Sequence, residues 1–172
     1  RFGSTAEETT ARQQVESLLR CYLANLPADE PRPLAVEALL EQPLVDPATG
    51  EDFGVPLLGI VDLVLGGEAG PTIIDFKSTA RSAPPHEITH EVQLSCYAWL
   101  FRQSSGRRES GLEIRSLVKT KQPQVQQHRY PARRPQHFAR LFALIRANLD
   151  DLDAGRGSMI VAATESRYMP PW

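Results

Sequence analysis

Charged residues interrupt two apolar stretches in the middle of the sequence. Asp62 lies within the stretch GIVDLVL, and Asp75 and Lys77 lie within the stretch TIIDFKS. An ionised side chain inside a buried strand costs free energy unless it is paired or bound to a ligand. We therefore take these three residues as the first candidates for chemistry.

The spacing of Asp75 and Lys77 puts them on one face of a strand, because alternate residues of a strand share a face. If the strand that carries Asp62 lies alongside, two carboxylates and an ammonium group meet at one end of a sheet. Two close carboxylates repel each other, and a hard divalent cation such as Mg²⁺ removes that repulsion and can activate water beside the lysine. The spacing alone does not distinguish this site from a structural ion pair in which Lys77 neutralises one aspartate.

The elements that must position these residues follow from the hydrophobic pattern. A first helix is predicted from Ser4 or Thr5 to the residue before Pro27. Residues 34–65 predict a hairpin with a wide loop, and residues 72–79 predict a third strand of a meander. A second helix is expected over residues 87–103, and a fourth strand that continues toward a fifth within residues 112–132. A last helix ends near Gly155, so the predicted order is αβββαβα.

Length and composition are those of an ordinary globular chain. The 172 residues suffice for one domain over residues 1–172, and no apolar run reaches the roughly 20 residues of a membrane span. The net charge of −2 means that any contact with DNA must come from a local basic cluster. The N-terminal segment RFGSTAEE has no apolar signal-peptide core and no initial Met. We therefore expect an intracellular protein, cytoplasmic or nucleoid-associated in a bacterium or phage, and a fragment of a longer chain.

Four short motifs, in this order along the chain, resemble those of one known family. They are the GxxD of residues 59–62, the DFK of residues 75–77, and the Gln and Tyr that begin and end QLSCY, residues 93–97. The arrangement resembles the RecB-like nuclease branch of the PD-(D/E)XK superfamily, over about residues 34–121. The resemblance implies an α/β fold with a restriction-endonuclease-like core, in which a small mixed sheet is flanked by helices.

The resemblance also implies roles for individual residues. Asp62 and Asp75 resemble the metal-binding carboxylates of the family, and the main-chain carbonyl of Phe76 resembles a third protein ligand. Lys77 resembles the residue that orients or deprotonates the attacking water. Glu37 matches an acidic position that often precedes GxxD, where it could bind a second metal or orient a water. For Glu37, an ordinary exposed strand glutamate is the alternative.

Three further pairs are candidates for support of the site or for contact with nucleic acid. Gln93 and Tyr97 lie four residues apart and share a helix face. In the family such a pair supports the catalytic residues and contacts DNA, although a tyrosine at this place can also be a simple core residue. Lys119 and Lys121 alternate along the predicted fourth strand and resemble basic residues that approach the DNA backbone, with a solvated strand face as the alternative. The third pair, for which a simple helix start is the alternative to phosphate contact, is His86 and His90.

The function that the resemblance implies is that of a Mg²⁺- or Mn²⁺-dependent deoxyribonuclease, and we expect an exonuclease. It implies DNA as the substrate, a role in DNA repair or recombination, and a helicase or another repair protein as a candidate partner. Cys21 and Cys96 are too few for the iron–sulfur cluster of some relatives, so no cluster is expected in this chain. The alternatives are a non-catalytic DNA-binding or scaffolding module with the same fold, and an enzyme of another class that uses a lysine and carboxylates.

Overall fold

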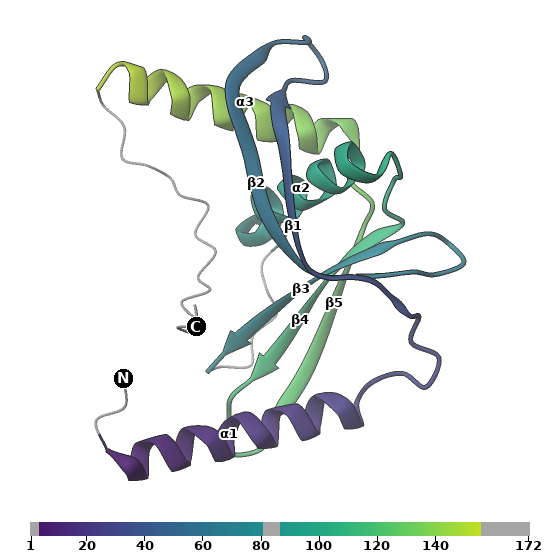
Figure 1. The fold of residues 1–172 in the computed structure, drawn as a ribbon, viewed down its shortest axis with the longest axis vertical. Coiled ribbons are helices and arrows are strands. Elements are labelled where there is room, and N and C mark those ends of the chain that lie inside the picture. Colours follow the sequence, from purple (N-terminus) through teal and green to yellow (C-terminus); the bar gives the residue numbers. More distant parts are fainter. Residues whose placement is uncertain (1–3, 81–86, 156–172) are drawn as a thin grey trace.

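In the computed structural model, which describes residues 4–80 and 87–155, the helices and strands follow the order αβββαββα (Figure 1). They are α1 (Thr5–Ala24), β1 (Pro33–Val45), β2 (Asp52–Leu65), β3 (Thr72–Thr79), α2 (Glu87–Ser105), β4 (Gly111–Val118), β5 (Gln124–Pro131) and α3 (Pro135–Asp153). No helix within the described ranges has the length and apolar content needed to cross a membrane.

The strands form one mixed sheet in the spatial order β1-β2-β3-β4-β5. β1 and β2 form the predicted antiparallel hairpin, and β3 continues the meander antiparallel to β2. The connection through α2 makes β4 parallel to β3, and β5 returns antiparallel to β4. Because β3 and β4 are parallel, their C-terminal residues Thr79 and Val118 lie side by side at one end of the sheet.

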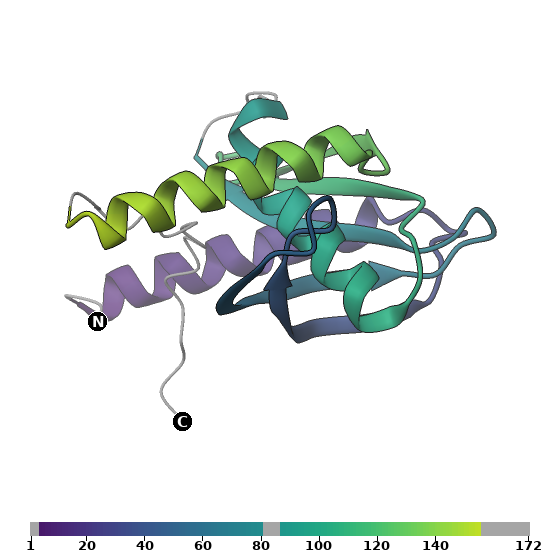
Figure 2. The same cartoon turned by 90° about the horizontal axis from the view of Figure 1, so that it is seen from above.

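Helices cover both faces of the sheet. Seen from above, α3 and α2 lie on the near side of the strands and α1 lies on the far side (Figure 2). The main core lies under α2, where Leu94 and Leu100 pack with Ile73 of β3 and Ile114 of β4. A smaller cluster on the face toward α1 includes Ile74 and the partly buried Phe76. Alternate residues of β3 therefore face different helices, as the strand period requires.

The α/β fold class and the expected sequence of elements are confirmed, with one correction at the fourth strand. β4 ends at Val118, and residues 119–123 form a turn before β5. Pro123 has no N–H to donate to a ladder, and the Thr120 hydroxyl bonds to the Gln122 carbonyl within the turn. Lys119 and Lys121 therefore lie in this turn and do not alternate along a strand face.

The apolar face predicted for α1 is only partly covered. Leu18 is buried and the Tyr22 ring meets the Phe76 ring edge-on, with 5.5 Å between centroids. Val15, Leu19 and Leu23 remain more than half exposed. The reason is that α1 contacts mainly β4 and β5, so a flank of its apolar stripe extends beyond the sheet.

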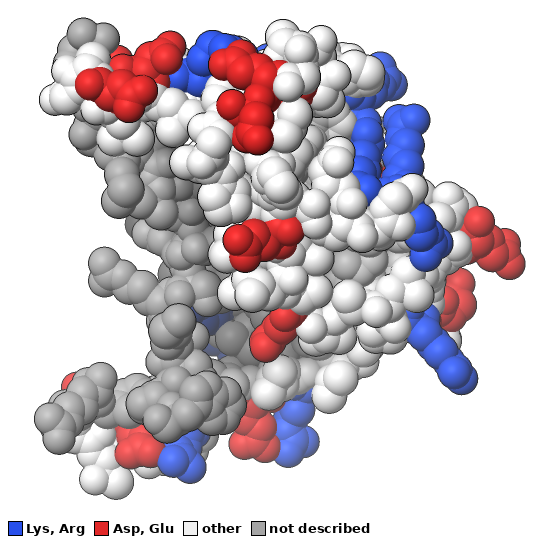
Figure 3. Space-filling view, turned by 45° about the horizontal axis from the view of Figure 1, so that its top comes forward, with Lys and Arg blue, Asp and Glu red and all other residues white. Residues whose placement is uncertain are grey.

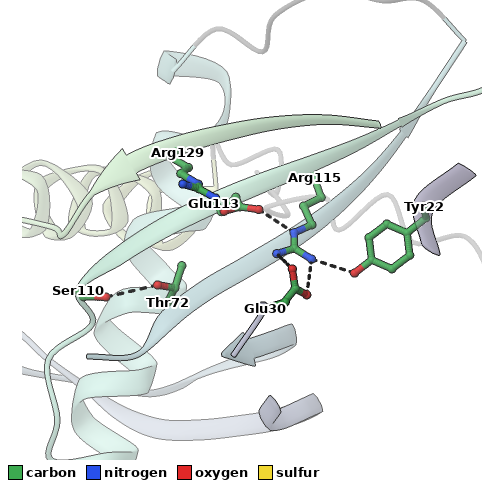
Figure 4. A network of polar contacts seen from close by, with 7 residues as sticks. All are labelled: Tyr22, Glu30, Thr72, Ser110, Glu113, Arg115 and Arg129. Carbon is green, nitrogen blue, oxygen red and sulfur yellow. Dashed lines mark hydrogen bonds and ion pairs between the residues drawn. The ribbon is translucent and has the colours of Figure 1, made fainter. Parts of the chain in front are cut away.

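A buried ion network attaches the segment after α1 to the sheet (Figure 4). The Arg115 guanidinium of β4 donates to both carboxylate oxygens of Glu30, at 2.8 and 2.9 Å, and to the Tyr22 hydroxyl at 2.9 Å. It also donates to Glu113 at 2.6 Å. Arg115 is paired with Phe76 in the register of β3 and β4, so this network lies beside the middle of β3 on the face toward α1.

Candidate active site

Three carboxylates lie in one row across β1, β2 and β3. The register of β1 and β2 places Glu37 opposite Asp62, because the pairs on both sides of this position follow the same register. The register of β2 and β3, in which Leu63 pairs with Ile74, places Asp62 opposite Asp75 at the next position. The sequence predicted the neighbourhood of Asp62 and Asp75, and the row adds Glu37 at its outer end.

Asp62 is tied to the main chain of β3. The Phe76 N–H donates to Oδ2 of Asp62, with 2.7 Å between the heavy atoms. The last paired residues of β2 and β3 are Leu63 and Ile74. Beyond this pair, the Asp62 side chain of β2 accepts the hydrogen bond from the main chain of β3. This bond holds the β2 carboxylate against the segment that carries the other candidate residues.

Asp75 and Lys77 share one face of β3 and form an ion pair. The Lys77 Nζ lies 3.2 Å from Oδ1 and 2.9 Å from Oδ2 of Asp75. The Asp75 side chain is 2% exposed, whereas the Lys77 side chain is 31% exposed and so reaches solvent. Lys77 bonds Oδ1 with good geometry, but Oδ2 is buried and accepts no hydrogen bond of suitable geometry from a described residue. Because Oδ2 lies in the ion pair with Lys77, a further ligand at this oxygen would share it with the ammonium group.

The pKa values of both aspartates are raised, because burial makes their ionised forms costly. Burial raises the pKa of Asp75, although the hydrogen bond and charge of Lys77 act in the opposite direction. Burial also raises the pKa of Asp62, where the Phe76 N–H lowers it and the charge of Asp75 raises it further. Glu37 raises the pKa of Asp62 as well, by a smaller amount. The folded chain therefore gathers more negative charge than Lys77 neutralises.

Tyr97 and Gln93 of α2 stand over this row, as the spacing of the two residues predicts. Tyr97 is 4% exposed, and the Gln93 side-chain amide donates to its hydroxyl oxygen at 2.9 Å. Burial raises the pKa of Tyr97 to about 12, and the charges of Asp75 and Asp62 contribute to the rise. The hydroxyl therefore stays protonated at neutral pH. Because Gln93 donates to its oxygen, the proton is available for a second partner near the carboxylates.

The glycine of the GxxD motif allows β2 to approach α2. A Cβ atom at Gly59 would lie 2.9 Å from Cδ1 of Leu100 and 3.4 Å from Cε1 of Tyr97. The first distance is shorter than normal contact, and Leu100 is fully buried. Gly59 thus provides the space in which Tyr97 reaches the carboxylate row.

Comparison with known proteins supports the family assignment. The sequence profile of the PD-(D/E)XK nuclease superfamily matches residues 3–164. The chain belongs to the PD-(D/E)XK nuclease superfamily. One similar structure is described as a "Putative exonuclease" from Eubacterium rectale, with 13% sequence identity and a TM-score of 0.56. That similarity covers 97% of this chain but only 63% of the other, and it shows a shared fold alone.

A second solved structure, of a protein called SSO0001, has 15% identity and a TM-score of 0.46, over 73% of this chain and 52% of that one. No curated protein matches this sequence. The family assignment of this PD-(D/E)XK chain therefore rests on the sequence profile, and the assignment of its site rests on its own residues.

Nucleases of the PD-(D/E)XK superfamily typically use divalent metals, and the donor set here fits such an ion. Asp62 and Asp75 offer carboxylate oxygens on adjacent strands, and a bound cation would offset the cost that burial puts on their ionised forms. Carboxylate oxygens are the ligands that Mg²⁺ prefers. In the described part of the chain, no group of three or more His, Cys, Asp or Glu side chains is gathered closely enough to hold one ion. Two carboxylates thus form the core of the candidate set.

Two features of this PD-(D/E)XK site were not foreseen from the sequence. Glu37 is exposed and has a φ of 47°, in the left-handed region that non-glycine residues rarely adopt. Burial lowers the pKa of His90, and the charge of the nearby Lys77 lowers it further. The sequence pattern indicated only a helix start or a phosphate contact for His90, and His86 lies outside the described residues. Only spatial proximity to Lys77 singles out His90.

Proposed function

We propose that this chain is a divalent-metal-dependent deoxyribonuclease of the RecB-like branch that hydrolyses phosphodiester bonds as an exonuclease. The observation that carries the proposal is the pairing of Asp62 with the Asp75–Lys77 face of β3, fixed by the Phe76 N–H, within the fold of this superfamily. A structural ion pair alone would not require the second, half-buried carboxylate of Asp62. The role in repair or recombination, and a helicase as partner, rest on the motif resemblance.

Asp62, Asp75 and the main-chain carbonyl of Phe76 are the residues proposed to hold Mg²⁺ or Mn²⁺. The bound cation would supply Lewis acidity toward water and toward the phosphate oxygens. Glu37, at the exposed end of the row, is proposed to orient a water molecule. Among the described residues, no three His, Cys, Asp or Glu side chains gather closely enough to hold one ion, so Glu37 is not proposed as a ligand of the same ion.

Lys77 is proposed to act on the attacking water and the phosphate. Its partly exposed ammonium group can donate to both, and Asp75 keeps it at the mouth of the site. A positioned cation that meets the developing negative charge is worth more in a partly dry site than in water. Tyr97 stays protonated at neutral pH, and its hydroxyl is proposed to donate a hydrogen bond to a carboxylate. Gln93 fixes the orientation of the ring.

The experiment is a cleavage assay on linear and circular DNA labelled at the 5′ or the 3′ end, in Mg²⁺, Mn²⁺ or EDTA. We expect shortening of linear DNA with either metal, none in EDTA, and intact circles. Asp75→Asn is the inactive control, because it removes charge at nearly constant volume. Cleavage that persists in EDTA or in this variant would refute the proposal, and cut circles would replace the exonuclease by an endonuclease.

One observation favours the non-catalytic alternative. Lys77 already neutralises Asp75 at 2.9 Å, so the buried charge is satisfied in part without a cation. A binding module of this kind would retain affinity for DNA and show no metal-dependent cleavage in the same assay.

A further inference from the structure

A polar groove lies between α1 and the turn that joins β4 to β5. Its volume is about 380 Å³. The polar residues that line it are Thr10, Gln13, Gln14 and Ser17 of α1 and Lys119, Thr120 and Lys121 of the turn. The four helix residues follow the spacing i, i+3, i+4 and i+7, which places them on one face of α1. The groove thus has a wall of amides and hydroxyls opposite two ammonium groups.

Negative charge is absent from this groove. No Asp or Glu lines it. Four of the five charged residues of α1 form two ion pairs with each other, and the fifth, Glu7, lies one turn before Thr10. The pairs are Glu8 with Arg12 and Glu16 with Arg20, each at 2.7 Å. Among the described residues, neither Lys119 nor Lys121 has a carboxylate partner, and both are exposed. The two ammonium groups are therefore available to an anionic ligand.

The chain as a whole does not attract a polyanion, because its net charge is −2. On the face shown in Figure 3, acidic and basic side chains of the described residues both occur, and several basic side chains lie together near the upper right edge of the view. Contact with nucleic acid must therefore come from a few local sites.

The groove lies close to the candidate active site along the backbone. The Lys119 N–H donates to the Thr79 carbonyl at 2.7 Å, and Thr79 is two residues beyond Lys77. That path measures about 7 Å along β3 and about 5 Å across to the turn. Figure 1 shows the ends of β3 and β4 directed over the N-terminal half of α1.

We propose that this groove binds the sugar–phosphate backbone of the nucleic acid strand whose scissile bond lies in the candidate active site, an inference that rests on the proposed function. Lys119 and Lys121 bind phosphates, and Gln13 and Gln14 donate to phosphate or sugar oxygens from the opposite wall. No aromatic side chain lines the groove, so bases cannot stack there. Such contacts position a strand but carry no sequence information. The strand reaches the groove around the exposed end of β3, because the carboxylate row faces α2 and the groove faces α1.

The test compares a 12-nucleotide with a 4-nucleotide single-stranded DNA, both fluorescein-labelled, for binding in Ca²⁺ and for cleavage in Mg²⁺. The 12-mer spans both the site and the groove, whereas the 4-mer fits the site alone. The variant Gln13→Glu/Gln14→Glu places two negative charges in the groove at constant shape. We expect the ratio of 12-mer to 4-mer affinity to fall about tenfold, or about 1.4 kcal/mol.

The matched control is Gln103→Glu/Arg107→Gln, which makes the same net charge change at exposed positions at the end of α2 and should leave the ratio as in the wild type. A second variant, Lys119→Ala/Lys121→Ala, should flatten the plot of log K against log salt by about 1.4, the value for two single-strand phosphate contacts. The groove proposal is wrong if the ratio of 12-mer to 4-mer affinity falls equally in the control. It is also wrong if the salt slope is unchanged in the lysine variant.

The outcomes separate the groove from the proposed function. If the protein cleaves DNA but the groove variants leave the ratio of 12-mer to 4-mer affinity unchanged, the groove proposal is wrong and the proposed nuclease function stands. Length-dependent binding that the glutamates weaken, without cleavage, keeps the groove as a nucleic-acid site and removes the nuclease. Thermal unfolding of each variant confirms that a loss of affinity does not arise from loss of the fold.

Discussion

The main-chain N–H of Phe76 donates to the Asp62 carboxylate at 2.7 Å, and this bond joins the two halves of the candidate site. Phe76 lies between Asp75 and Lys77, so one contact fixes the β2 carboxylate relative to both. The bond lowers the pKa of Asp62, but burial and the neighbouring Asp75 outweigh it and the pKa is raised overall. The fold thus holds these candidate ligands in place against their repulsion.

We predict that Asp62→Asn stabilises the metal-free protein at neutral pH. The folded-state pKa of Asp62 is raised above the unfolded value, so the folded chain binds this proton more readily. The associated stability is present below the unfolded pKa, near 3.9, and is lost as pH rises through the folded pKa. Asparagine keeps an oxygen for the Phe76 N–H and removes the charge.

The measurement for Asp62→Asn is thermal unfolding in EDTA across pH. The melting temperature of the variant should exceed that of the wild type near pH 7, and the difference should shrink in acid. Mg²⁺ should raise the melting temperature of the wild type by mass action and have a smaller effect on the variant. A variant that is less stable than the wild type at pH 7 would show that the charge of Asp62 is already compensated.

Lys77→Met should reduce turnover by about 10²- to 10⁴-fold, the range for loss of an acid–base group. Methionine keeps the length and the apolar stem of the side chain. Because the ammonium of Lys77 lies 2.9 Å from Asp75, it competes with a cation for that carboxylate. The thermal shift on addition of Mg²⁺ should therefore be larger in the variant than in the wild type. A smaller shift would mean that Lys77 assists metal binding instead of competing with it.

The local periodicity of the sequence was sufficient for part of this site. Period two placed Asp75 and Lys77 on one face, and the helical spacing of Gln93 and Tyr97 aligned them toward the sheet, as the structure shows. The short turn after Leu65 predicted that Asp62 would lie beside β3. These features depend on residues near each other in the chain, where a pattern determines direction.

Features that depend on distant residues could not be predicted in this way. Nothing in LAVEALL indicates that Glu37 adopts a left-handed φ, because glutamate has no intrinsic preference for it. The Arg115 network joins residues up to 93 positions apart, so its charges appear in the sequence as ordinary surface residues. The end of β4 before Lys119 is set by a turn bond between Thr120 and Gln122, which gives no periodic signal.

Glu37→Gly should stabilise the fold while it lowers activity. A left-handed backbone costs a non-glycine residue about 1–3 kcal/mol, and glycine removes most of that strain. We expect a gain of about 1 kcal/mol in the free energy of unfolding, measured by chemical denaturation, together with a loss of cleavage. Glu37→Gln is the matched control, because it removes the charge and keeps the strain. Equal stability of the two variants would show that repulsion with Asp62, and not the backbone, is the cost at this position.

Arg115→Met should destabilise the protein by about 3–5 kcal/mol, because it leaves the carboxylates of Glu30 and Glu113 without their shared cation. The triple variant Arg115→Met/Glu30→Gln/Glu113→Gln should recover most of the loss, since removal of a whole buried network is often nearly neutral. Loosening of α1 should accompany the single change, because Arg115 also holds the Tyr22 hydroxyl that sits against Phe76. Chemical denaturation measures the stability of both variants, and limited proteolysis within α1 reports the loosening. A single variant that loses less than about 1 kcal/mol would show that Arg129, which lies 3.1 Å from Glu113, compensates that carboxylate.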